Sequence, residues 1–297
     1  MPSRIWRVAP LLLAAASLFW AGNAIVGRAF HAEIPPVSLA FWRWTGAFLV
    51  TLPFAREPLG NDWPTLLRHW RSLLILSLTG IALFNTLFYR GLDQTTAING
   101  VLLQSTMPLM ILLASALIYR ERPSLTQTIA ILISLLGVLV IAVHGSLARL
   151  GALSLNPGDV WVLAAVASYA LYSSLLRSRP PVHPMSFLAA SFALGALMLL
   201  PLYVAEICSG AVTRITPGTL ASFVYVALMP SCIAYLCFNR GVELIGSARG
   251  GQYVHLVPVF GVLLAVLLLG ERLYLFHLFG AVLIAVGLAL ASCVRSG

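Results

Sequence analysis

Amide and aromatic side chains recur at helical spacing within stretches that are otherwise apolar. Asn85 and Tyr89 are four residues apart, so they lie on one face of a helix. Tyr235 and Asn239 occupy the corresponding positions 150 residues later. The full ring that we expect comprises Trp20, Asn23, Asn85, Tyr89, Tyr169, Tyr172, Tyr235 and Asn239. Such a ring suits a molecule with an apolar or planar body and a few polar groups. For Tyr89 and Tyr172, an aromatic belt at the membrane surface is the alternative.

Two prolines, Pro108 and Pro258, lie midway along predicted helices and are also related by a shift of 150. Each removes a backbone hydrogen bond and kinks its helix. A freed carbonyl is tolerated within a membrane only where protein or a water-filled cavity satisfies it. We therefore expect the polar residues nearby to face a common interior: Gln104, Ser105, Gln252 and His255. The alternative is that they only bond to neighbouring helices.

Ionisable groups are rare inside the predicted helices, where they are costly and usually functional. Only Arg43 and His255 are found there, with no Asp or Glu. Arg43 is a candidate to bind a carboxylate, but snorkelling or bonding to backbone carbonyls is the favoured interpretation. His255 is expected to be a neutral, hydrogen-bonding imidazole. Without a buried carboxylate to carry protons, the sequence predicts uncoupled uniport or exchange.

Several kinds of chemistry are excluded by composition. All 18 cationic residues are arginine, so there is no lysine for a phosphate-binding loop or a Schiff base. Neither a zinc-protease nor a serine-hydrolase motif is present, and the four cysteines lack metal-ligand spacing. The net charge of +9 comes from scattered arginines. We expect no enzyme activity, no metal, no cofactor and no nucleic-acid partner.

The chain is 60% hydrophobic and 9% charged, with a mean hydropathy of +0.95. A soluble protein carries roughly 25% charged residues. Crossing a bilayer takes about 20 apolar residues, and ten such runs are present. They lie near 8–27, 37–55, 72–92, 97–119, 126–143, 158–177, 184–204, 219–239, 249–269 and 274–293. Short turns separate them, including Glu57-Pro58-Leu59-Gly60. The sequence predicts an all-α integral membrane protein of ten transmembrane helices.

The second half of the chain repeats the first. A shift of 150 without a gap matches Phe88, Arg90, Gly91, Gly100, Pro108, Glu121, Arg122 and Gly137 with Phe238, Arg240, Gly241, Gly250, Pro258, Glu271, Arg272 and Gly287. The predicted units are residues 1–147 and 148–297. Five helices is an odd number, so the second unit is inverted relative to the first. Inverted repeats are typical of secondary transporters, whose substrate site lies between the halves.

Arginine counting predicts the orientation. With the N-terminus inside, the inner segments hold 12 arginines and the outer ones hold five. The excess places both termini in the cytoplasm. The paired turns Glu121-Arg122 and Glu271-Arg272 are expected to be structural and to hold the fourth and fifth helices of each unit together. We expect a monomer or weak homodimer in the lipid bilayer.

Several stretches resemble the EamA family of the drug/metabolite transporter superfamily. In the second half they are Pro258-Val259-Phe260-Gly261, Leu269-Gly270-Glu271-Arg272-Leu273 and the segment 280–287. In the first half they are Leu18-Phe19-Trp20-Ala21-Gly22-Asn23, Phe41-Trp42-Arg43 and Glu121-Arg122. The chain departs from the pattern at Tyr119-Arg120, where the second half has Leu269-Gly270.

The resemblance implies a bacterial inner-membrane protein of ten helices. It also implies export of small metabolites, often amino acids, from the bacterial cytoplasm, and the inverted repeats predict that export proceeds by alternating access. A channel-like pore and a membrane-embedded enzyme are the alternatives. The absence of a nucleophile or metal cluster argues against the enzyme.

Overall fold

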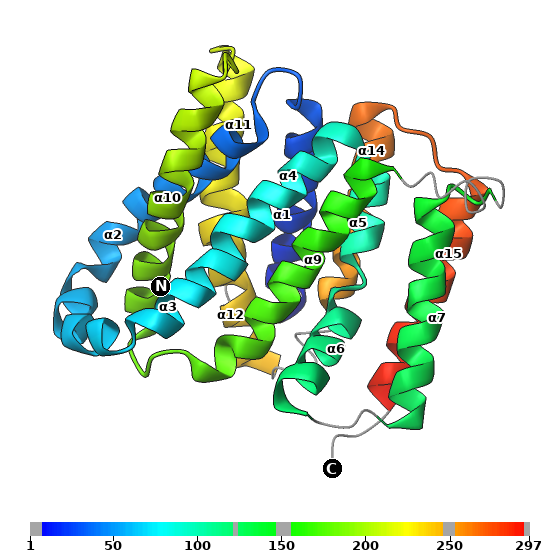
Figure 1. Ribbon diagram of the computed structural model, residues 1–297, viewed down its shortest axis with the longest axis horizontal. Helices are drawn as coiled ribbons and strands as arrows, with labels where there is room; N and C mark the ends of the chain where they lie inside the picture. The colour runs from blue at the N-terminus through cyan, green and yellow to red at the C-terminus, as the bar shows by residue number, and fades with distance from the viewer. Residues whose placement is uncertain (1–7, 121–123, 147–155, 246–252, 294–297) are drawn as a thin grey trace.

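The computed structural model describes residues 8–120, 124–146, 156–245 and 253–293. These residues form helices without any strand (Figure 1). The elements are α1 (Ala9–Ala29), α2 (Pro36–Arg68), α3 (Trp70–Ser77), η2 (Leu78–Leu83), α4 (Phe84–Gln94), α5 (Ala97–Gln104), α6 (Met107–Tyr119), α7 (Leu125–Ala142), α9 (Pro157–Leu175), η3 (Leu176–Ser178), α10 (Pro184–Cys208), α11 (Pro217–Leu228), η4 (Met229–Ile233), α12 (Ala234–Ile245), η5 (Tyr253–His255), α14 (Leu256–Leu269) and α15 (Leu275–Cys293). The segments η2 and η4 are π-helical, whereas η3 and η5 are 3₁₀ turns.

Ten helical segments of the described chain correspond to the ten predicted apolar runs, and up to six of them are long and apolar enough to cross a membrane. Five are long and apolar enough by themselves: α1, Trp70–Gln94, α7, α10 and Pro217–Ile245. The pair α5 and α6 makes a sixth, bent by 43°. Tyr253–Leu269 and Leu275–Leu290 are shorter apolar helices, and α2 and α9 complete the set. The prediction of an all-helical, ten-segment membrane protein is confirmed.

Local signals explain where the helices begin. Thr96 and Asn156 accept hydrogen bonds from the backbone at the starts of α5 and α9. Ser124 and Thr216 form capping boxes with the residues three positions later, at α7 and α11. Each cap satisfies an amide that has no partner within its helix. The predicted helix starts are therefore close to the observed ones.

The predicted turn at Glu57-Pro58-Leu59-Gly60 is wrong. Helix α2 continues through it to Arg68, with Pro53, Pro58 and Pro64 inside the helix. Figure 1 shows the ribbon curving round one flank of the bundle there. Each proline removes one backbone hydrogen bond and bends the helix. Repeated prolines here curve the helix without ending it.

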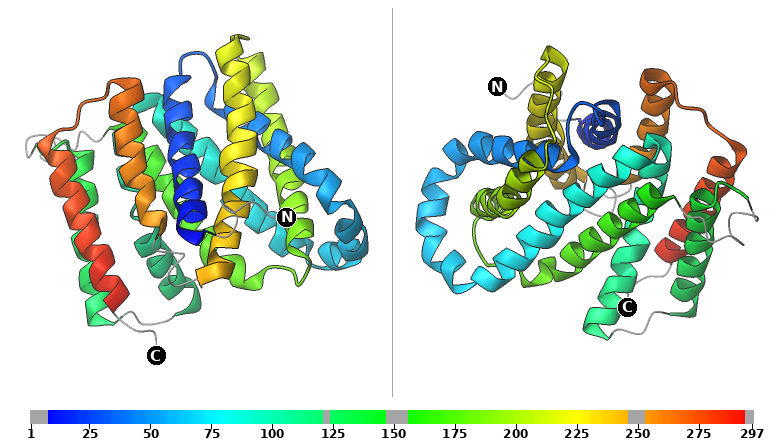
Figure 2. Two further views of the ribbon diagram at one scale, coloured as in Figure 1. Left: turned by 180° about the vertical axis from the view of Figure 1, so that it is seen from behind. Right: turned by 45° about the horizontal axis from the view of Figure 1, so that its top comes forward.

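Two helices form a closely packed pair at one flank of the bundle. Figures 1 and 2 show α7 and α15 side by side along one flank. They meet at small residues: a Cβ added to Gly137 would lie 2.7 Å from the carbonyl oxygen of Gly280. Close backbone approach through small residues is how helices associate in lipid, where the hydrophobic effect between them is absent.

A methyl group at this contact should destabilise the protein. Gly137→Ala forces α7 away from α15, so we expect the free energy of unfolding to fall by about 1–3 kcal/mol. Thermal unfolding of the purified protein in detergent measures it. Gly60→Ala is the matched control, since no atom lies within 4 Å of its added Cβ within α2. Equal melting temperatures for the two variants would contradict the prediction.

Backbone irregularities recur at nearly the same shift as the sequence repeat. The π-helical segment η2 begins at Leu78, and η4 begins 151 residues later at Met229. Left-handed residues end α6 at Arg120 and α14 at Gly270, with φ of 55° and 65°. A break at Ser105 and Thr106 corresponds to the 3₁₀ turn η5. π-Helical segments often lie at functional sites, and Ser231 of η4 lies at the centre of the site described next.

Candidate functional site

Arg43 of α2 is buried in the interior of the bundle, with 5% of its surface exposed. Its Nε donates to Ser231 Oγ at 2.9 Å. Its Nη1 lies 2.7 Å from Asn23 Oδ1 and 2.8 Å from Asn85 Oδ1. The Tyr89 hydroxyl completes the shell at 3.0 Å. The favoured sequence-based interpretation, snorkelling or bonding to backbone carbonyls, is wrong because four neighbouring polar side chains hold the guanidinium inside.

Four elements meet at this arginine. Asn23 comes from α1, Asn85 and Tyr89 from α4, and Ser231 from η4. The tyrosine hydroxyl also donates to Asn23 Oδ1 at 2.6 Å, while Asn85 Nδ2 donates to the carbonyl of Ile81. The spacing of Asn85 and Tyr89 did predict one shared face. We call these five residues the Arg43 cluster.

Part of the Arg43 guanidinium has no hydrogen-bond partner in the described chain. Its Nη2 has no hydrogen-bond partner among the described residues, and no carboxylate there lies within 4.0 Å of it. The face of the Trp44 ring lies 4.8 Å from the guanidinium carbon. A cation–π contact contributes about 2 kcal/mol when desolvated, which compensates only part of the cost of a buried charge. The cluster therefore carries an unneutralised positive charge.

A small cavity adjoins the cluster through Trp44. It has a volume of about 20 Å³ and is lined mainly by aromatic and apolar side chains from both halves: Trp44, Gly80, Ile81, Tyr169, Tyr172, Phe187, Leu188, Ser191, Phe192 and Tyr235. That volume holds about one water molecule. Two buried donors at its wall, Trp44 Nε1 and Ser191 Oγ, have no hydrogen-bond partner in the described chain.

The predicted aromatics fall on two sides of this cavity. Tyr169 packs on Phe84 with ring centroids 4.9 Å apart and on Tyr172 at 5.3 Å. Trp20 lies edge-on to Tyr235 at 5.9 Å and donates from Nε1 to the carbonyl of Pro230. Of the predicted ring, Tyr169, Tyr172 and Tyr235 line the cavity and Trp20 packs on Tyr235, whereas Asn23, Asn85 and Tyr89 bond to Arg43.

Other predicted site residues lie elsewhere. Asn239 and His255 are exposed and have no hydrogen-bond partner in the described chain, so neither belongs to the Arg43 cluster. Gln104 and Ser105 are half-buried, and the serine hydroxyl donates to the carbonyl of Leu102. Gln252 lies outside the described residues.

The two prolines do not lie midway along helices. Pro108 is the second residue of α6, directly after the break that bends α5 from α6 by 43°. Pro258 is the third residue of α14, after the turn η5. The first turn of a helix tolerates proline because its amides have no partner there. A bend accompanies Pro108, but the helix is broken there and not merely kinked.

Glu271 joins the two halves of the chain. Its carboxylate accepts from the backbone amides of Ala97 and Ile98 at 2.7 and 2.9 Å, which caps α5. Arg28 Nε lies 4.0 Å from it, and Arg28 Nη1 donates to the carbonyls of Leu92 and Asp93. Capping a helix of the other half differs from the predicted role within one unit. Arg272 is exposed, and Glu121 and Arg122 lie outside the described residues.

Sequence reasoning missed a buried carboxylate, Asp159. It is fully buried in the first turn of α9 and accepts from Thr95 Oγ1 at 2.6 Å and from Asn99 Nδ2. Asn99 Oδ1 in turn bonds to His277 Nε2 of α15 at 3.0 Å. The sequence-based expectation concerned helix interiors, and Asp159 lies in a first turn, so it was passed over although it is buried. The helix-start pattern Asn156-Pro157-Gly158 places Asp159 at a helix end, which hid its burial.

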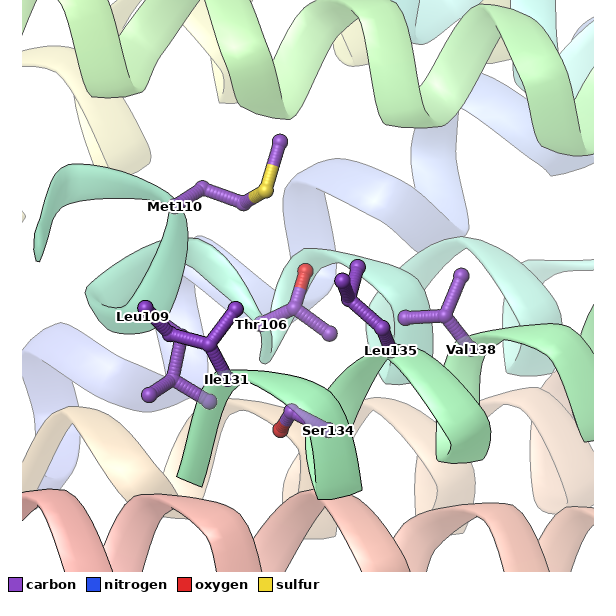
Figure 3. A pocket seen from close by; sticks show the side chains of 7 residues that line it. All are labelled: Thr106, Leu109, Met110, Ile131, Ser134, Leu135 and Val138. Carbon is purple, nitrogen blue, oxygen red and sulfur yellow. The ribbon is translucent and has the colours of Figure 1, made fainter. Parts of the chain in front are cut away.

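A second void lies between α6 and α7 and has a volume of only about 10 Å³. Figure 3 shows Thr106, Leu109 and Met110 on one side and Ile131, Ser134, Leu135 and Val138 on the other. That volume is at the lower limit for one water molecule. This void is a packing defect beside the α7–α15 pair, not a binding site for a metabolite.

The fold and the site define a class. A bundle of ten helical segments that encloses a charged, polar centre between two repeating halves has the architecture of secondary transporters.

The comparisons define the family. The EamA-like transporter family matches residues 7–143 and again residues 156–293, so the chain belongs to this family. An uncharacterized transporter of Bacillus subtilis, YyaM, is 26% identical over 96% of this chain and 93% of its own length. A probable terminal-alkyne amino-acid exporter of Streptantibioticus cattleyicolor is 28% identical over 75% of this chain and 72% of its own length. A solved crystal structure shares the fold, with a TM-score of 0.61 and 21% identity over 96% of each chain.

Proposed function

We propose that this transporter exports small metabolites from the bacterial cytoplasm, with neutral or zwitterionic amino acids as its first candidates. The observation that carries the proposal is the Arg43 cluster with its adjoining cavity, to which both halves contribute. A relative described as a probable amino-acid exporter supports the substrate class. The arginine distribution supports insertion in the inner membrane with both termini in the cytoplasm.

The small size of the cavity supports alternating access. Binding pockets for small molecules are roughly 300–1,000 Å³, whereas this cavity is about 20 Å³. A metabolite fits only after the halves separate around the cluster, as in other transporters built from inverted repeats. We propose residues 1–147 and 148–297 as the two moving units. A continuous channel does not fit so closed an interior.

Transport is proposed to be uniport or exchange without proton coupling. Among the described residues, the buried carboxylate Asp159 is the group to weigh against this proposal. Its place at the N-terminus of α9 and its bonds from Thr95 and Asn99 favour the ionised form, whereas its complete burial favours the neutral form. Because these bonds join α9 to α5 and to the turn before it, we propose a structural role for Asp159.

Proteoliposomes test both the function and its energetics. Counterflow of labelled amino acids should exceed that of empty liposomes severalfold, and an imposed pH gradient alone should drive no accumulation. Asp159→Asn and His255→Ala should leave that insensitivity unchanged. Accumulation driven by the gradient and lost in Asp159→Asn would show that the carriage is proton-coupled. Absence of counterflow for every amino acid would exclude them as substrates.

A further inference from the structure

The centre of this protein has hydrogen-bond donors without acceptors. A guanidinium offers five N–H donors and no acceptor, and an indole offers one donor. In the described chain, two buried groups, Trp44 Nε1 and Ser191 Oγ, lack hydrogen-bond partners. Arg43 Nη2 also has no partner there, since all four bonds of the guanidinium come from Nε and Nη1. Buried donors without acceptors are costly. The two buried groups and the free nitrogen of the guanidinium together indicate a position for a ligand that supplies acceptors.

The positive charge of Arg43 also indicates a position for a ligand, because no described carboxylate neutralises it. All four polar partners of the guanidinium are neutral side chains, and the described carboxylates that are buried or capping act elsewhere. Glu271 caps α5, Glu206 caps α2 and Asp159 bonds to Thr95 and Asn99. A buried cation without a counterion is costly, which makes it a site where function outweighs stability.

We propose that Arg43 binds the carboxylate of the transported molecule. The neutral shell of Asn23, Asn85, Tyr89 and Ser231 orients the guanidinium, and Nη2 supplies the free donor. Arginine pairs with carboxylates through short, charge-assisted hydrogen bonds. This inference rests on the proposed transport function and narrows its substrates to small molecules with a free carboxylate.

The cavity determines what the rest of the substrate looks like. Trp44 has its ring against the guanidinium and also lines the cavity, so the two are adjacent. The other walls are aromatic, with Tyr169, Tyr172 and Tyr235 among them. Aromatic walls favour a planar or apolar body. The expected ligand is a monocarboxylate whose apolar part enters the cavity as the halves separate.

A substitution beside Arg43 separates a binding role from a structural one. Asn85→Asp has nearly the same shape and places a carboxylate 2.8 Å from Nη1. It gives the buried cation an internal counterion, so the fold should be at least as stable. If Arg43 binds substrate, the new side-chain carboxylate at position 85 pairs with the guanidinium in place of the substrate carboxylate. The affinity for carboxylate substrates should then fall by about tenfold to a hundredfold. If Arg43 is only structural, binding is unchanged.

The measurement uses the purified full chain in detergent, with matched pairs such as phenylalanine and phenylalaninamide. The rise in melting temperature with ligand concentration gives the affinity for each ligand. The wild type should bind the carboxylate at least tenfold more tightly than the amide, and Asn85→Asp should lose that preference. Asn239→Asp is the control, since Asn239 is exposed and has no polar partner in the described chain. Trp44→Phe, which keeps the ring and removes the free donor, should weaken carboxylate binding severalfold.

The outcomes distinguish the two proposals. Equal binding of carboxylate and amide by the wild type, or a preference that survives in Asn85→Asp, overturns the role of Arg43 and leaves transport standing. Absence of counterflow in proteoliposomes for carboxylates and amides alike overturns the transport proposal and this inference with it.

Discussion

Replacing Arg43 with methionine should reduce counterflow by about a hundredfold while the protein still inserts and folds. Two hydrogen bonds to a charged group, at about 1.5–3 kcal/mol each, account for a loss of that size. The fold should survive because the variant also removes a buried charge that no carboxylate in the described chain neutralises. Replacing buried ionic groups by apolar ones of similar volume is often neutral or stabilising.

Counterflow and thermal unfolding must be measured on the same preparations. Arg43→Lys is the informative companion, since it keeps the charge but has no planar fork to bond with Ser231 and Asn23 together. We expect it to retain part of the activity. If Arg43→Met loses transport and stability in parallel, and Arg43→Lys does so too, the arginine holds the helices together and does nothing more.

The sequence predicted the membrane helices well because crossing a bilayer imposes one length and one composition. Runs near 97–119 and 184–204 correspond to Ala97–Tyr119 and Pro184–Cys208. The sequence-based prediction failed where the same local signal is compatible with two structures. The prolines of α2 mark a turn in many proteins, but here they curve a continuous helix.

The site was predicted in part, for a similar reason. Helical spacing places Asn85 and Tyr89 on one face, but spacing alone does not identify what they face. Only the packing of α1, α2, α4 and η4 brings them to Arg43. Asn239 corresponds to Tyr89 in the sequence repeat and is exposed, so the two halves share a pattern without sharing their surroundings.

Opening the bundle at the end where Glu271 meets α5 requires the loss of its two hydrogen bonds. Those bonds connect the α14–α15 turn to the N-terminus of α5, at the upper end of Figure 1. Arg28 adds a charge beside them and bonds to the last turn of α4. We therefore expect Glu271→Ala to favour the state that is open at this end. A helix cap contributes about 0.5–2 kcal/mol, so the open population should rise about tenfold.

A native cysteine reports this change. Cys232 is half-buried, follows Ser231 of the Arg43 cluster, and has its Sγ 3.9 Å from Thr51 Oγ1. With the other three cysteines changed to serine, it becomes the single target for a water-soluble maleimide. Glu271→Ala should raise its labelling rate about tenfold over the same background. Arg272→Ala is the control, because the neighbouring arginine is exposed and without a polar partner in the described chain. Equal rates in the two variants would mean that the Glu271 cap stabilises α5 without controlling access to the centre.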